Sequence, residues 1–162
     1  MRNVVQILLA VILALFLFTV LQRISVFFIQ LFNFFSLVVL YFALTKNEIY
    51  GACMGTVCGL LQDAFSLGVF GVSGISKTIM GFLAGYISKK INVIPYFRNL
   101  VFMFIMLCLE FALWSFLYTF IYSEKLLIGK NLFTLQPAAT AILGSLLFLF
   151  LPKTGISPES QI

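Results

Sequence analysis

Long apolar runs separated by short polar breaks dominate the chain. Runs of this kind are typical of membrane proteins rather than of a soluble domain with a rich core, because a helix needs about 20 residues to cross a hydrocarbon layer of roughly 30 Å. Six runs come close to that length: 4–21, 26–44, 50–65, 69–88, 99–122 and 138–151. The pattern predicts an all-α, polytopic integral membrane protein, a bundle of about six helices.

Basic residues and prolines mark the ends of several runs. Arg2 and Arg23 bracket the first, and Lys89–Lys90 close the fourth. The sixth run is short and sits between Pro137 and Pro152, which are expected to bound its helix.

The predicted spans define a single transmembrane domain over residues 1–152. A short polar C-terminal tail, 153–162, contains Gly155 and Pro158 and is expected to be disordered. The first run has the basic start and apolar core of a signal peptide. No small-x-small cleavage site precedes Gln22–Arg23, so we expect this segment to be retained as a helix.

Composition supports the membrane assignment. The 162 residues are 62% hydrophobic and only 9% charged, and the mean hydropathy is +1.15. A soluble domain of this length needs more polar surface to stay dissolved. The net charge of +5 would also suit a nucleic-acid partner, but the basic residues are scattered between apolar runs rather than gathered on one wet face. We therefore expect membrane lipid, and no nucleic acid, around this chain.

The distribution of basic residues predicts an orientation. Six spans place both termini on one side of the membrane. That side would hold Arg2, Lys46, Lys89, Lys90, Arg98 and Lys153. The other side would hold only Arg23, Lys125 and Lys130. Because basic loops are retained in the cytoplasm, both termini are predicted to be cytoplasmic.

Three ionisable residues, Asp63, Lys77 and Glu110, fall at membrane depth, where each needs a partner in the bundle interior. The rise per residue puts Lys77 and Glu110 both about 18 Å above the inner interface, and Asp63 about 7 Å higher, within reach of an extended lysine. We expect Lys77 to pair with Glu110. The pair either fixes helix register or belongs to a cluster that binds a ligand, carries protons or responds to a partner. Asp63 joins that cluster or caps a turn at the outer interface.

Small residues recur at helical spacing in the third and fourth runs. In the third run they are Gly51, Gly55 and Gly59. In the fourth run they are Gly74, Thr78, Gly81, Gly85 and Ser88. Such stripes let helix backbones approach closely in lipid, where packing drives association. Two adjacent stripes predict a tightly packed helical hairpin.

The chain offers little for catalysis. It contains no His, which excludes Ser-His-Asp and Cys-His sets, and it has no phosphate-binding loop. Cys53, Cys58 and Cys108 lie within apolar runs without a C-x-x-C pair and are expected to be small buried hydrophobic residues. Asp63 and Glu110 belong to different helices at different heights. We expect no catalytic residue, no metal and no cofactor, and thus a protein that is not an enzyme.

The stretch GLLQDAFSLGVFGVSGISKTIMGFLAGYIS, Gly59–Ser88, resembles the central motif of MreD, the rod shape-determining membrane protein of bacteria. That family reads G-L-x-x-D, then a short turn with Ser and Gly, then a small-residue run ending in G-Y or G-F-L-x-G. The matching residues are Gly59, Leu60, Asp63, Ser66, Gly71, Ser76, Lys77, Thr78, Gly81, Gly85 and Tyr86. The layout of two spans, the motif hairpin and two less distinctive spans is also similar to the family.

The resemblance implies a non-enzymatic scaffold of the cell-wall elongation machinery in the bacterial cytoplasmic (inner) membrane, one that maintains rod shape. The implied partner is MreC, a single-span periplasmic protein, in a complex that links MreB filaments to RodA and a class B penicillin-binding protein. The implied fold resembles the six-helix substrate-binding subunit of energy-coupling factor transporters.

A rival function starts from the charged residues themselves. The interior near Asp63, Lys77 and Glu110 would serve as the pocket of a membrane-embedded small-molecule binding subunit of a transporter. For the two hypotheses together, the candidate motif, partner or polar-cluster residues are Gly59, Asp63, Ser66, Gly71, Lys77, Thr78, Gly81, Gly85 and Glu110.

Overall fold

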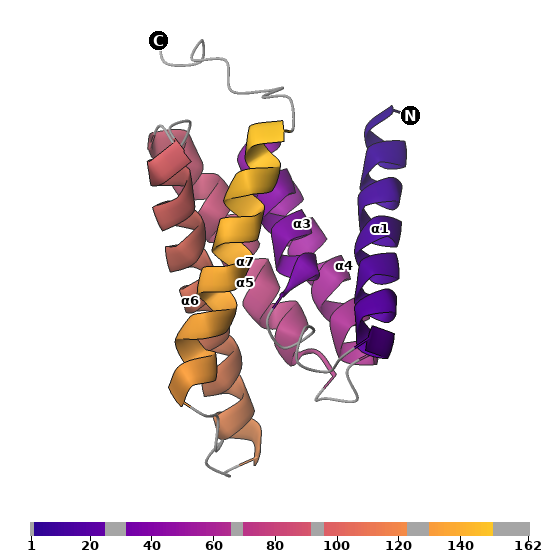
Figure 1. The fold of residues 1–162 in the computed structure, drawn as a ribbon, viewed down its shortest axis with the longest axis vertical. Helices are drawn as coiled ribbons and strands as arrows, with labels where there is room; N and C mark the ends of the chain where they lie inside the picture. The colour runs from indigo at the N-terminus through magenta and orange to yellow at the C-terminus, as the bar shows by residue number, and fades with distance from the viewer. Residues whose placement is uncertain (1, 25–31, 66–69, 92–95, 123–129, 151–162) are drawn as a thin grey trace.

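A computed structural model describes residues 2–24, 32–65, 70–91, 96–122 and 130–150. These residues form six helices and no strand: α1 (Arg2–Ile24), α3 (Phe34–Thr45), α4 (Glu48–Phe65), α5 (Val72–Lys90), α6 (Tyr96–Tyr122) and α7 (Lys130–Phe150). The prediction of an all-α chain is confirmed. Consecutive helices run in alternating directions, so the first turn of α1 and the last turn of α7 lie at the same end of the bundle (Figure 1).

Helix α3 is the centre of the bundle. It contacts α1, α4, α5 and α7, while α6 packs against α5 and α7. Phe35, Val39 and Leu40 of α3 are buried, and Met80 of α5 and Met103 of α6 continue the same core. The most extensive helix contact joins α4 to α5.

The second predicted helix, 26–44, begins later than the sequence indicated. Residues 25–31 lie outside the described part of the chain, but Phe32 and Asn33 are described and are not helical. The Asn33 side chain accepts a hydrogen bond from the Ser36 N–H at 3.3 Å, which makes Asn33 the N-cap of α3. An uninterrupted helix over this range is therefore wrong, because an asparagine that satisfies the first free N–H groups favours a helix start over a helix interior.

The sixth predicted helix was too short. Helix α7 begins at Lys130 and runs through Pro137, so the expected start at Ala138 is wrong. An interior proline removes one backbone hydrogen bond, yet a helix held by neighbours tolerates that loss, and α7 packs along α6. The predicted helix end at Leu151 and the predicted polar tail, 153–162, lie outside the described residues.

An ion pair closes one end of the α4–α5 hairpin. Lys89, in the last turn of α5, forms an ion pair with the carboxylate of Glu48, the first residue of α4. The contact with Lys89 lowers the pKa of Glu48 below its ordinary value. Glu48 also supplies the negative charge that favours a helix N-terminus.

One described helix is both long and apolar enough to cross a membrane, the stretch Tyr96–Ile121 of α6, with a hydropathy of 2.3. Shorter apolar stretches of 10–17 residues are Leu9–Val20, Phe34–Thr45 and Leu135–Phe148. Helix α6 therefore agrees with a membrane location.

Candidate functional site

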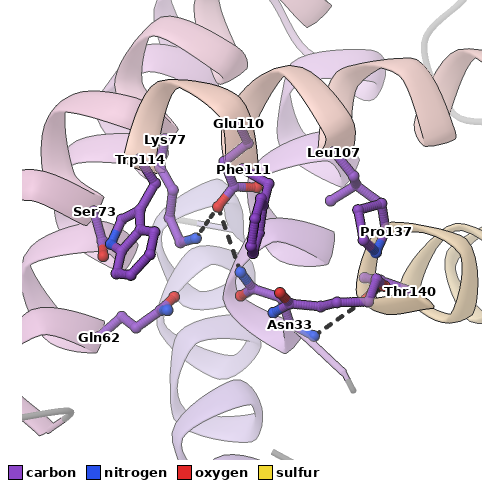
Figure 2. A pocket seen from close by; sticks show the side chains of 11 residues that line it. Asn33, Gln62, Ser73, Lys77, Leu107, Glu110, Phe111, Trp114, Pro137 and Thr140 are labelled. Atoms are coloured by element: carbon purple, nitrogen blue, oxygen red, sulfur yellow. Dashed lines mark hydrogen bonds and ion pairs between the residues drawn. The ribbon is translucent and has the colours of Figure 1, made fainter. Parts of the chain in front are cut away.

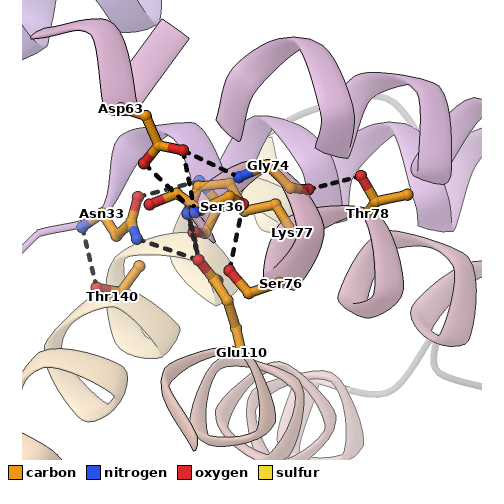
Figure 3. Close-up of polar contacts among 10 residues, drawn as sticks. Asn33, Ser36, Asp63, Gly74, Ser76, Lys77, Thr78, Glu110 and Thr140 are labelled. Atoms are coloured by element: carbon orange, nitrogen blue, oxygen red, sulfur yellow. Dashed lines mark hydrogen bonds and ion pairs between the residues drawn. The ribbon is translucent and has the colours of Figure 1, made fainter. Parts of the chain in front are cut away.

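A buried ion pair lies where α3, α5 and α6 meet. Lys77 of α5 donates to Glu110 Oε1 of α6, and the two residues are only 1% and 5% exposed. Ser36 of α3 completes the contact, accepting from Lys77 Nζ at 2.8 Å and donating to Glu110 Oε1 at 2.8 Å. The expected contact between Lys77 and Glu110 is therefore present, and a hydroxyl from a third helix joins it (Figure 3).

Asn33 connects this pair to the last helix. Its side-chain amide donates to Glu110 Oε1 at 3.4 Å, and its backbone N–H donates to the Thr140 hydroxyl on α7 at 3.3 Å. Sequence reasoning missed both Asn33 and Ser36. The signal was a pair of polar residues three apart, N-F-F-S, inside an apolar run, which is the spacing of a helix cap.

Asp63 forms no ion pair or hydrogen bond with Lys77. Its carboxylate instead accepts backbone N–H groups at the start of α5, from Gly71 at 2.8 Å, Ser73 at 3.1 Å and Gly74 at 3.4 Å (Figure 3). Asp63 is 6% exposed. The structure thus agrees with the interpretation of Asp63 as a cap. A carboxylate is suited to this place because the first N–H groups of a helix carry partial positive charge.

Gly71 allows the chain to reach that cap. Its φ of 100° lies in the left-handed region, which residues other than glycine rarely adopt. The same residue is the N-cap of α5 and donates its N–H to Asp63. Ser66, the other turn residue of the motif, lies outside the described residues.

The small-residue stripes face each other across α4 and α5. A side chain at Gly55 would meet the backbone carbonyl of Lys77, and one at Gly59 would come within 2.5 Å of Gly74 Cα. At the other end, a side chain at Gly85 would come within 2.5 Å of Glu48 Cα.

Further contacts along the same seam follow this pattern. Gly51 and Gly81 are in reciprocal backbone contact, and the hydroxyls of Thr56 and Thr78 lie 2.8 Å apart. The expected close hairpin is therefore present.

A cavity of about 230 Å³ lies beside the ion pair (Figure 2). Helices α4, α5, α6 and α7 and the N-cap residue of α3 line it: Asn33, Gln62, Ser73, Lys77, Leu107, Glu110, Phe111, Trp114, Gln136, Pro137 and Thr140. Among the lining residues, Lys77 and Thr140 are buried, whereas Gln62, Trp114 and Gln136 are partly exposed. The sequence predicted an internal polar cluster but not the amides and aromatic rings that border it.

The two charged side chains at this site are paired with each other. Lys77 and Glu110 hold each other, so neither is set up as a nucleophile or a proton donor to a substrate. Within the described ranges, no three His, Cys, Asp or Glu side chains gather closely enough to hold a metal ion. Cys58 is buried, Cys108 is partly buried, and Cys53 is exposed, contrary to the expectation that all three would be buried.

Comparison of the chain with protein-family models, with curated proteins and with solved structures finds no match. The functional assignment therefore depends on the residues and their geometry.

Proposed function

We propose that this chain is a multi-pass protein of the bacterial cytoplasmic membrane. Its surface carries large apolar side chains on many helices, with Phe116 and Phe120 of α6 exposed by 68% and 79%. In water, an apolar surface of this extent would drive association. A lipid environment accounts for it without any further partner.

Helix lengths support more than one crossing. Helices α1, α5 and α7 have 23, 19 and 21 residues, or about 28–34 Å at 1.5 Å per residue. Helices α4 and α5 are less apolar because they carry charged residues, of which Glu48, Lys89 and Lys90 lie at helix ends and Asp63 and Lys77 are buried with partners. Both termini would be cytoplasmic because more basic residues lie on that side.

Within that membrane, the proposed role is a non-enzymatic scaffold of the cell-wall elongation machinery, similar to MreD. One observation carries it: residues of the motif Gly59–Ser88 hold three helices together. Asp63 caps the start of α5, Gly59 of α4 lets the α5 backbone approach closely, and Lys77 joins α5 to α6. A closely packed hairpin of this kind suits a protein that presents a fixed surface to partners.

The proposed partner is a single-span periplasmic protein of the MreC type. Through it, and through MreB, RodA and a class B penicillin-binding protein, the chain would position lateral wall synthesis. The fold would then resemble the substrate-binding subunit of energy-coupling factor transporters.

Depletion in a rod-shaped host tests the scaffold. Cells that lose the protein are expected to become round while septal wall synthesis continues, and an ectopic wild-type copy should restore rods. The tagged protein should copurify with a single-span periplasmic protein. Depleted cells that stay rod-shaped would contradict the proposal.

The cavity beside Lys77 and Glu110 supports a second candidate, a small-molecule binding subunit of a transporter. That function predicts copurification with ATPase and coupling subunits, retention of a ligand detectable by mass spectrometry, and a vitamin requirement on depletion with unchanged cell shape. These outcomes are the reverse of those expected for the scaffold.

A further inference from the structure

We propose that the cavity beside the Lys77–Glu110 pair binds an uncharged group with neighbouring hydroxyls, either the glycerol headgroup of a lipid or a free polyol such as a sugar. This inference does not depend on the scaffold role, since it concerns the purified chain alone. It begins from the polar groups at the cavity wall.

Several of these groups keep hydrogen-bonding capacity. All three hydrogen bonds that Glu110 accepts from described residues go to Oε1, which leaves Oε2 as an acceptor. The hydroxyl of Ser73, the indole N–H of Trp114 and the amide of Gln136 make no hydrogen bond to the part of the chain that the structure describes. Polar groups that line a cavity without a protein partner are suited to a ligand or to water.

Charge excludes most ionic ligands. The cavity lining contains one cation, Lys77, and one anion, Glu110, and they are paired. A bound ammonium near Glu110 Oε2 would be repelled by the nearby Lys77 ammonium. A bound phosphate would be repelled by Glu110, and the Lys77 ammonium that could attract it already donates to two acceptors. Like charges at such separations repel strongly away from bulk water. The ligand that fits best carries no net charge at this point.

Hydroxyls match the groups that remain. One hydroxyl can donate to Glu110 Oε2, and neighbouring hydroxyls can accept from the indole N–H of Trp114 or bond to the Gln136 amide. Leu107, Phe111 and Pro137 supply apolar walls for the C–H faces of such a molecule. The volume of about 230 Å³ is below the roughly 300–1,000 Å³ of pockets for drug-sized ligands, so it suits a headgroup or a single sugar ring.

Trp114 makes the site directly observable, because it is the only tryptophan in the chain. The full-length protein is placed in phosphatidylcholine nanodiscs bounded by a non-aromatic polymer, so that no other tryptophan is present, and the phosphatidylcholine headgroup has no hydroxyl or N–H donor. In one arm, an increasing share of the lipid is phosphatidylglycerol, and phosphatidylmethanol serves as a probe of equal charge without hydroxyls. In the other arm, glycerol or methyl glucoside is added to the phosphatidylcholine discs.

A saturable change in Trp114 emission with phosphatidylglycerol and none with phosphatidylmethanol would identify a lipid headgroup. A change only with glycerol or methyl glucoside would identify a free polyol. Ser73→Ala and Gln136→Leu should each weaken binding by roughly tenfold. Thr119→Val, on the exposed face of α6, should leave it unchanged.

Three results would overturn the assignment: no response in either arm, an equal response to phosphatidylmethanol, or undiminished binding by both cavity variants. None of these results bears on cell shape, so failure here is distinguishable from failure of the scaffold proposal.

Discussion

Lys77 joins two parts of the molecule. Its backbone carbonyl lies against Gly55 of α4, so this turn of α5 packs closely on α4, the other helix of the hairpin. Its side chain leaves in another direction and reaches Glu110 of α6 beside Ser36 of α3. Four helices, α3 to α6, are thus connected through one buried residue whose charge is paired with that of Glu110.

We expect Lys77 and Glu110 to be energetically coupled. Lys77→Met strands a carboxylate and Glu110→Gln strands an ammonium, so each change should lower the free energy of unfolding by on the order of 1–4 kcal/mol. The double replacement should cost less than the sum of the two. Thermal unfolding of the four purified proteins measures this, and strict additivity would contradict the coupling.

Asp63 gives a second prediction at this scale. Asp63→Ala leaves the N–H groups of Gly71 and Ser73 without their acceptor and should lower the free energy of unfolding by about 1–2 kcal/mol. Asp63→Asn keeps one acceptor oxygen and should cost less. The comparison of melting temperatures in detergent tests this order, and equal melting temperatures for wild type and Asp63→Ala would refute the cap.

At the scale of elements, the α4–α5 hairpin is the unit that the motif builds. Its two helices are in backbone contact along their length, from Gly59 and Gly74 near the Asp63 cap to Gly85 and Glu48 at the opposite end. Backbone contact this close requires glycine at the positions where the two helices meet.

Two glycine replacements in this hairpin should differ sharply. Alanine at Gly55 would drive its Cβ into the Lys77 carbonyl, whereas at Gly74 the nearest atom is a Leu60 side-chain carbon at 3.3 Å, which can move. Gly55→Ala should therefore lower the free energy of unfolding by about 1–3 kcal/mol. Gly74→Ala should change it by about 1 kcal/mol or less, since alanine favours a helix. Similar melting temperatures for the two variants would argue against the backbone contact.

At the scale of the whole molecule, the alternating helices bring the start of α1 and the end of α7 to one end of the bundle (Figure 1). If that end faces the cytoplasm, the α6–α7 connection faces the periplasm. A reporter that works only in the cytoplasm should be active when it is fused after Ile162, and a reporter that works only in the periplasm should be active when it is inserted within 123–129. Periplasmic activity at Ile162 would invert the proposed topology.

The sequence alone determined the features that depend on helical repeat and composition. Apolar runs without strand signals predicted helices, and the rise per residue put Lys77 and Glu110 at one height. Glycines four residues apart predicted a face that a neighbouring backbone can approach. Each of these follows from local geometry, which a single helix already contains.

Only the tertiary structure decided which groups meet across helices. The heights of the three charged residues along their helices were compatible with either Asp63 or Glu110 as the partner of Lys77. The orientation of α5 toward α6 selected Glu110. The cap at Asn33, the passage of α7 through Pro137 and the cavity beside Trp114 likewise depend on neighbouring helices. The physical reason is that the repeat along one helix sets the height of a side chain, while packing among helices sets the direction in which it finds a partner.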